Sequence, residues 1–231
     1  MKAVVLLSGG LDSTVCMSVA AKEGYEIYPI SFAYGQRHDR ETECAKRVAE
    51  YYGVARHLII STNMGAIGGS ALTADIDVPD GDDNRKDIPV TYVPARNLIF
   101  LSYALGYAEV LGAGKIYIGV NAVDYSGYPD CRPEFIDRFQ QLADYSTRAA
   151  AQDNKLIRVE TPLINLSKGD IIKLGRANGA PLDLTTSCYR GGERACGSCD
   201  SCLLRLRGFR EAGYRDPIPY IEEILRENGV I

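Results

Sequence analysis

The sequence lacks a hydrophobic run long enough to cross a membrane. Its first apolar stretch, residues 4–7, is far too short for a membrane span or a signal peptide. An excess of basic charge is also missing, because the formal net charge is −4 at pH 7, and this argues against broad, non-specific binding of nucleic acid. We therefore expect a cytoplasmic protein that has no membrane partner. We do not expect nucleic acid to be among its ligands.

The two commonest phosphate-binding motifs are missing as well. No G-x-x-x-x-G-K-[ST] string occurs, and no G-x-G-x-x-G follows a predicted strand. Residues 4–14 instead read V-V-L-L-S-G-G-L-D-S-T. The apolar residues predict a short buried strand, the two glycines a tight turn, and the polar residues after them the start of a helix over residues 15–22. A strand, a glycine turn and a helix start together form an anion site, so the expected ligand carries phosphate.

The rest of the chain alternates between strand and helix patterns. With 231 residues, 46% of them hydrophobic and 24% charged, it is long enough for one large domain, or one domain with a small appendage. Further strands are predicted at residues 26–34, 57–60, 115–120 and 156–160. Helices are predicted at 40–52, 98–111, from 133 onward, after a cap at Ser167, and at 217–228. This order predicts a doubly wound, mostly parallel α/β sheet of the Rossmann-like type, with its ligand at the carboxyl ends of the strands.

Three polar segments are candidates for contact with that ligand. Residues 61–90 are rich in Gly, Pro and Asp and predict a long loop, which we interpret as a lid over a nucleotide. Arg96 lies in a helical first turn, where a cation indicates a nearby anion unless the side chain is simply exposed. Lys168 either points to solvent or reaches the phosphates.

The loop over residues 121–132 follows the fourth predicted strand and is rich in Tyr and Asp. Its rings could stack on a purine-like heterocycle and its carboxylates could accept hydrogen bonds from N–H edges, or the rings could merely pack on the sheet edge. Cys131 lies in the same loop, but no base partner for it is evident in the sequence.

Seven cysteines are present, and four of them crowd into fifteen residues as Cys188-x7-Cys196-x2-Cys199-x2-Cys202. An odd number with such crowding does not suit a secreted disulfide framework. A structural zinc is the first interpretation and an iron–sulfur cluster the second, with a disulfide or free thiols remaining. Because several arginines surround the cluster, an RNA-binding zinc knuckle is also open.

Several of these stretches carry a resemblance to known enzymes. S-G-G-L-D-S resembles the pyrophosphate loop of the ATP pyrophosphatases. L-S-G-G-L-D-S-T, F-A-Y-G-Q-R-H, V-P-A-R-N, D-Y-S-G-Y-P-D-C-R and the cysteine cluster together resemble the 7-cyano-7-deazaguanine synthase family. The resemblance implies an adenine nucleotide alpha hydrolase-like domain over residues 1–180. A zinc-binding helical appendage over residues 181–231 would pack on it, or form one domain with it.

The resemblance also implies a reaction. 7-Carboxy-7-deazaguanine, ammonium, ATP and Mg²⁺ would give the nitrile 7-cyano-7-deazaguanine, a queuosine precursor, through an acyl-adenylate and an amide, with release of AMP and pyrophosphate. The enzyme would be an ATP-dependent carbon–nitrogen ligase and a homodimer. No stretch suggests a glutaminase, so free ammonium is the expected nitrogen source.

The site residues that follow from the resemblance fall into four groups. ATP would be bound by Leu7, Ser8, Gly9, Gly10, Leu11, Asp12, Ser13 and Thr14, with Asp12 helping to hold Mg²⁺. Catalysis would involve Asp12, Ser13, Arg96 and Lys168. The deazapurine would be bound by Asp124, Tyr125, Ser126, Tyr128, Asp130 and Arg132. Structural zinc would be bound by Cys188, Cys196, Cys199 and Cys202.

Two rival functions stay open at this point. Another pyrophosphate-loop enzyme, such as a tRNA thiolase or an amidating ligase, would share the first motif, although a thiolase needs a cysteine free to carry a persulfide. A nucleotide-sensing or RNA-binding module would use the cysteine cluster and carry out no chemistry. Turnover of ATP to AMP separates the enzymes from the module.

Overall fold

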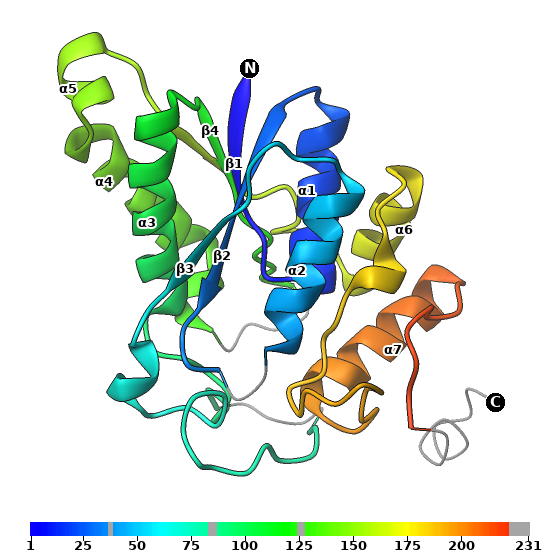
Figure 1. The fold of residues 1–231 in the computed structure, drawn as a ribbon. Coiled ribbons are helices and arrows are strands. Elements are labelled where there is room, and N and C mark those ends of the chain that lie inside the picture. The colour runs from blue at the N-terminus through cyan, green and yellow to red at the C-terminus, as the bar shows by residue number, and fades with distance from the viewer. Residues whose placement is uncertain (37–38, 83–86, 124–127, 222–231) are drawn as a thin grey trace.

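Five parallel strands form the centre of the computed structural model, which describes residues 1–36, 39–82, 87–123 and 128–221 (Figure 1). Their spatial order is β3-β2-β1-β4-β5. The strands are β1 (Lys2–Leu6), β2 (Glu26–Ala33), β3 (Leu58–Ser61), β4 (Lys115–Tyr117) and β5 (Arg158–Glu160). The chain winds outward from β1 in both directions, so the connections on its two sides diverge and leave a crevice at its carboxyl end.

Helices cover both faces of the sheet (Figure 1). They are α1 (Leu11–Lys22), α2 (Arg40–Tyr51), α3 (Arg96–Leu111), α4 (Pro133–Ser146), α5 (Arg148–Asp153), α6 (Lys168–Ala177) and α7 (Asp200–Ala212). Val4 and Leu6 of β1 point into one core with α3 and α4, while Ala3 and Val5 point into the other with α1, α2 and α6. Both faces of β1 are therefore buried, which explains its continuous apolar sequence.

The predicted doubly wound α/β sheet is confirmed, and the main differences lie at the ends of elements. β4 ends at Tyr117 and β5 begins at Arg158, so both strands are shorter than predicted. The helix prediction was wrong for residues 217–221, which are not helical and in which Tyr220 forms a bridge with Ala195. Residues 222–228 of that prediction lie outside the described part of the chain.

Two helices, α5 and α7, were not predicted. The buried face of α7 carries Arg205 and Gly208 among Cys202, Leu206 and Phe209, so an apolar period is hard to recognise there. In the described part of residues 62–90, a 3-10 helix (Met64–Ile67) is the only regular element, but Ala71 and Leu72 anchor the segment in the protein interior. Its role as a lid stays a prediction, and so does the division of the chain at residue 180.

Within the four described ranges, no helix is both long and apolar enough to cross a membrane.

Candidate active site and metal centre

A cleft of about 450 Å³ opens at the carboxyl ends of the central strands. The loop between β1 and α1 forms one wall and the residues after β4 form another. Of the predicted nucleotide-binding residues, those that line the cleft are Leu7, Ser8, Gly10, Leu11, Asp12 and Ser13. Gly9 and Thr14 lie behind this surface. The cleft thus lies where the topology of the sheet predicts a ligand site.

The loop from Ser8 to Ser13 holds its own shape through short polar contacts. The Ser13 hydroxyl donates to the Gly10 carbonyl at 3.0 Å and accepts from the Ser8 amide at 3.2 Å. Gly9 has a φ of +81°, and a Cβ there would lie 2.2 Å from the Glu41 carbonyl oxygen. Only glycine fits such a position without displacing the start of α2. Gly10 then caps α1 and directs the amino end of that helix toward the cleft.

Lys168 and Asp12 meet across the cleft. The Lys168 ammonium donates to both carboxylate oxygens of Asp12, at 2.8 and 2.7 Å. Lys168 is the first residue of α6, whose start is fixed by the Ser167 hydroxyl accepting from the Asp170 amide. Because Lys168 is only 7% exposed, its side chain points into the protein rather than to solvent. The structure thus excludes the solvent-facing orientation, and contact of Lys168 with the phosphates stays a prediction.

Arg96 lies at the start of α3 and lines the same cleft. Burial alone would lower the pKa of Arg96, but Tyr34, Tyr128 and Glu41 outweigh this effect and raise it. Burial also raises the pKa of Glu41, and the charge of Arg96 only partly offsets that rise. The cleft therefore holds a permanent cation close to a carboxyl group that resists ionisation.

The predicted substrate loop is anchored to α3 by Asp130. The Asp130 carboxylate accepts from the Asn97 amide at 2.9 Å, and the Asn97 side chain donates to the Asp130 carbonyl at 3.1 Å. Asp130 is buried beneath the helix start and does not line the cleft. Its carboxylate satisfies one of the free amides of the first turn of α3.

Other residues of this loop are divided between the cleft and its surroundings. Tyr128 and Cys131 line the cleft, with the Tyr128 hydroxyl 3.0 Å from that of Thr91. Arg132 precedes α4 as its N-cap and does not line the cleft. Asp124, Tyr125 and Ser126 lie outside the described residues. The roles proposed for all these residues stay predictions.

Several lining residues were not anticipated from the sequence. They are Phe32, Tyr34, Glu41, Phe100, Thr186, Ser187, Tyr189 and Arg205. The rings of Phe32 and Phe100 stack with centroids 3.9 Å apart and planes 4° apart, so they form a flat apolar surface. The F-A-Y stretch contained a signal for this surface, whereas Arg205 lies in a helix that the sequence did not predict.

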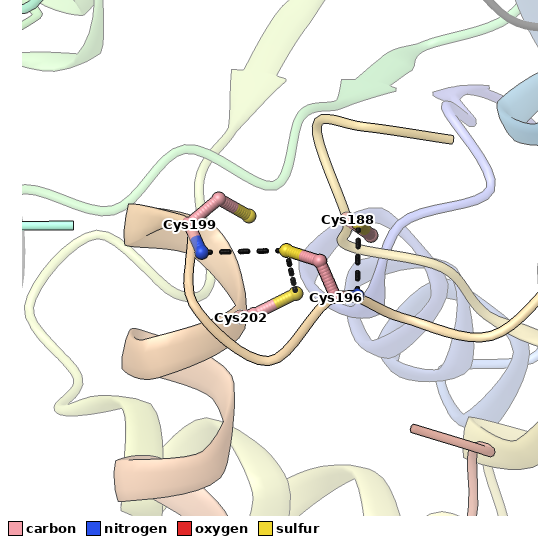
Figure 2. Close-up of side chains that lie close together, drawn as sticks. All are labelled: Cys188, Cys196, Cys199 and Cys202. Atoms are coloured by element: carbon pink, nitrogen blue, oxygen red, sulfur yellow. Dashed lines mark hydrogen bonds between the residues drawn. The ribbon is translucent and has the colours of Figure 1, made fainter. Parts of the chain in front are cut away.

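The four C-terminal cysteines come together at the start of α7 (Figure 2). All are buried, and their sulfur atoms lie within 4.8 Å of one another. A tetrahedral zinc with Zn–S bonds of about 2.3 Å separates its sulfur ligands by about 3.8 Å, so the cluster fits such an ion with small adjustments. The amides of Cys196 and Cys199 donate to the sulfurs of Cys188 and Cys196, each at 3.4 Å. Amide donors of this kind stabilise thiolates that bind a metal. None of the seven cysteines, all of which lie in the described ranges, forms a disulfide bond in the structure.

The sheet order and the position of the Ser-Gly-Gly loop define the class of this protein as an adenine nucleotide alpha hydrolase-like α/β protein. A solved 4-thiouridine synthetase, in complex with RNA and bound ATP, shares this fold with a TM-score of 0.51 at 20% identity. That comparison covers 99% of this chain and 50% of the synthetase chain.

Closer relatives define the family within this class. The family model described as Queuosine biosynthesis protein QueC matches residues 2–213. The 7-cyano-7-deazaguanine synthase of Desulfitobacterium hafniense is 62% identical over 223 residues, which cover 96% of this chain and 94% of the relative. The enzyme of the same name from Acetivibrio thermocellus is 62% identical over 222 residues, covering 96% and 98%. The chain belongs to the QueC family of 7-cyano-7-deazaguanine synthases.

Proposed function

We propose that this protein is an ATP-dependent carbon–nitrogen ligase that converts 7-carboxy-7-deazaguanine and ammonium into 7-cyano-7-deazaguanine for queuosine biosynthesis. The observation that carries the proposal is the meeting of Asp12, Lys168 and Arg96 in one cleft beside the Ser-Gly-Gly loop. Family membership supplies the identity of the acid and of its product.

The loop from Ser8 to Ser13, called the phosphate loop from here on, would bind the β- and γ-phosphates of ATP. Its amides and the Ser13 hydroxyl offer donors, and Lys168 and Arg96 offer positive charge, to the oxygens that gain charge when pyrophosphate leaves. Asp12 would help to hold Mg²⁺, since its side chain keeps 28% exposure beside Lys168. Mg²⁺, when bound, would neutralise charge on the phosphates.

The acid would lie with its carboxylate next to the α-phosphate. Attack of the carboxylate oxygen on that phosphorus gives an acyl-adenylate and releases pyrophosphate. Ammonia then displaces AMP and leaves the amide. The amide oxygen would then attack the α-phosphorus of a second ATP and release a second pyrophosphate, and loss of AMP and of the remaining N–H proton would give the nitrile. The protein would contribute mainly by positioning and by stabilising charge, since the described cleft offers no residue with the features of a covalent nucleophile.

The planar ring of the acid would bind among the aromatic side chains of the cleft. The stacked pair Phe32 and Phe100, with Tyr128 and Tyr189, offers ring faces and hydroxyl groups. Asp130 would serve this site through the hydrogen bonds that fix Asn97. Asp124, Tyr125, Ser126 and Arg132 remain candidates for contacts from the rest of the loop.

The four-cysteine cluster would bind one structural zinc. All four ligand positions are sulfur and all are buried, as in closed structural sites. An iron–sulfur cluster is the alternative, and metal analysis with an absorption spectrum separates the two, because zinc is colourless. We extend the proposal to a cytoplasmic homodimer, so sedimentation should give about twice the chain mass of 25.2 kDa.

The test is a coupled assay with the acid, ammonium, ATP and Mg²⁺, in which AMP, pyrophosphate and nitrile are followed by mass. Nitrile with two AMP per product supports the proposal. AMP without nitrile would retain the phosphate loop and reject the substrate. Folded, metal-loaded protein that forms no AMP with any candidate acid would favour a binding module instead.

A further inference from the structure

Arg205 is a buried cation that the proposed chemistry does not use. It lies in the middle of α7 and is only 2% exposed. Its Nε and one terminal nitrogen donate to the two carboxylate oxygens of Asp216, at 2.7 and 3.0 Å. That pairing is the bidentate geometry to which a guanidinium is best suited.

The remaining donors of Arg205 hold one segment of backbone and side chains. One terminal nitrogen donates to the hydroxyls of Thr185 and Ser187, at 2.7 and 3.2 Å. The terminal nitrogen that bonds Asp216 also donates to the Leu182 carbonyl, at 3.2 Å. A guanidinium has five N–H groups, and these contacts account for all five. Arg205 lines the cleft but has no donor left for a phosphate.

The residue between those two hydroxyls contacts the phosphate loop directly. The Thr186 amide donates to the Gly9 carbonyl at 3.0 Å, and Thr186 forms an isolated bridge with Gly10. Gly9 is closed in on its other side, where a Cβ would meet the Glu41 carbonyl. The loop is therefore held between the start of α2 and the Thr186 backbone.

The other end of this arrangement is the cysteine cluster. α7 is capped by Cys199 and carries Cys202 in its first turn, three residues before Arg205. Asp216 also accepts from the Tyr220 hydroxyl at 2.7 Å, and Tyr220 is bridged to Ala195, next to Cys196. The cysteine cluster and the loop are thus connected through a continuous series of side-chain and backbone contacts.

We infer that Arg205 is a positioning residue for the phosphate loop. By fixing Thr185 and Ser187 it sets the position of the Thr186 backbone and, through it, the Gly9–Gly10 backbone of the loop that would bind pyrophosphate. This inference rests on the proposed function for the identity of the ligand. The role of the four-cysteine cluster is then to orient α7 so that Arg205 reaches this segment.

Two substitutions test the inference on the full chain. Arg205→Lys keeps the charge and can pair with Asp216, but one ammonium cannot hold both flanking hydroxyls as the planar fork does. Thr185→Val removes one hydroxyl at nearly constant shape, at a residue that does not line the cleft. Arg215→Lys is the matched control, since Arg215 is exposed just beyond the same helix.

The measurements are pyrophosphate binding by titration calorimetry in the presence of Mg²⁺, metal content per chain, and the thermal midpoint. We expect both variants to keep their metal and to bind pyrophosphate about 10-fold more weakly, equivalent to about 1.4 kcal/mol. The control should bind as the unsubstituted protein does. KM for ATP should rise by a similar factor, with a smaller change in KM for the acid.

A lower thermal midpoint with unchanged pyrophosphate affinity would make Arg205 merely structural and overturn the inference. If Arg205→Lys does not fold, the gentler Thr185→Val decides the question by the same criterion. Unsubstituted protein that binds no pyrophosphate would overturn both this inference and the phosphate site. Protein that binds pyrophosphate but forms no nitrile would overturn only the proposed reaction.

Discussion

The contact between Gly208 of α7 and Lys168 of α6 leads to a quantitative prediction. A Cβ at Gly208 would lie 2.3 Å from Lys168 Cγ and 2.8 Å from Lys168 Cβ. Nonbonded carbon atoms prefer separations of about 3.5–4.0 Å. The colliding atoms lie near the backbone of α6, so Lys168 cannot simply swing away. The Gly208→Ala substitution should therefore push the two helices apart or displace Lys168 from Asp12.

The expected cost combines two opposing effects. Overpacking a tight contact costs about 1–3 kcal/mol, whereas replacing glycine by alanine inside a helix stabilises it by about 0.5–1 kcal/mol. Gly106 in α3 isolates the second effect, because it is exposed in a helix and a Cβ there meets nothing within 4 Å. Gly106→Ala should stabilise the protein, and Gly208→Ala should be less stable than Gly106→Ala by about 1–3 kcal/mol.

Urea unfolding followed by circular dichroism measures this difference, and sedimentation checks that both variants keep the same oligomeric state. For a chain of this size each kcal/mol shifts the thermal midpoint by about 2–4 °C. The midpoint of Gly208→Ala should thus lie about 2–12 °C below that of Gly106→Ala. ATP affinity should fall in Gly208→Ala alone. Equal stability of the two variants would refute the close approach of α6 and α7 on which this reasoning depends.

Three further predictions concern single side chains. Lys168→Met leaves the Asp12 carboxylate without its cation and should weaken ATP binding, measured by calorimetry, about 10-fold. Lys173→Met, at an exposed position of the same helix, should change ATP binding by less than about 2-fold. Equal effects of the two substitutions would contradict a specific role for the Lys168–Asp12 pair. Burial, and secondly the charge of Lys46, lower the pKa of His57 below 6.5. As the pH falls, His57 therefore gains its proton in the unfolded chain before it does in the folded protein, so the free energy of unfolding should decrease below pH 6.5. Urea titrations across pH 5–8 should show a flatter profile for His57→Gln, and an unchanged slope would dismiss the assignment. Burial raises the pKa of Cys131 to about 11, so its alkylation at pH 8, followed by mass spectrometry, should be about 100-fold slower than that of an exposed thiol; rapid modification would show that the thiol is not protected in this way.

The parallel sheet could be predicted because its strands are short apolar runs separated by glycine and polar breaks. Because both faces of β1 are buried, its sequence is a continuous apolar run that is typical of a central strand. Gly24 and Gly53, both at positive φ, follow the ends of α1 and α2. The ends of β4 and β5 could not be placed, because strand pairing with a neighbour decides where a strand stops, and apolar residues continue beyond that point. α7 was missed because its buried face contains an arginine whose charge is neutralised only by the tertiary structure.

The phosphate loop could be predicted because its conformation depends on neighbouring residues, with Gly9 at positive φ and Ser13 bonded to Gly10. The direction of Lys168 could not, since its partner Asp12 lies 156 residues away in the sequence. The position of Asp130 beneath α3 likewise depends on a long-range contact with Asn97. Local patterns therefore predicted the shape of the loop, whereas the pairing of Lys168 with Asp12 and of Asp130 with Asn97 required the folded structure.

The hydrogen bond from the Thr186 amide to the Gly9 carbonyl has a consequence for synthesis on the ribosome. The loop lies within the first 14 residues, yet the Thr186 amide, about 180 residues later, is what bonds the Gly9 carbonyl. The segment around Thr186 is held by Arg205, which pairs with Asp216. The pairing of β1 with β4, in which Ala3 lies opposite Lys115, likewise forms only after Lys115 has been made. A nascent chain will therefore expose residues 8–13 long before the residues that hold this loop in place have been made. Under the proposed function, ATP would be consumed only by chains that have been translated beyond Asp216.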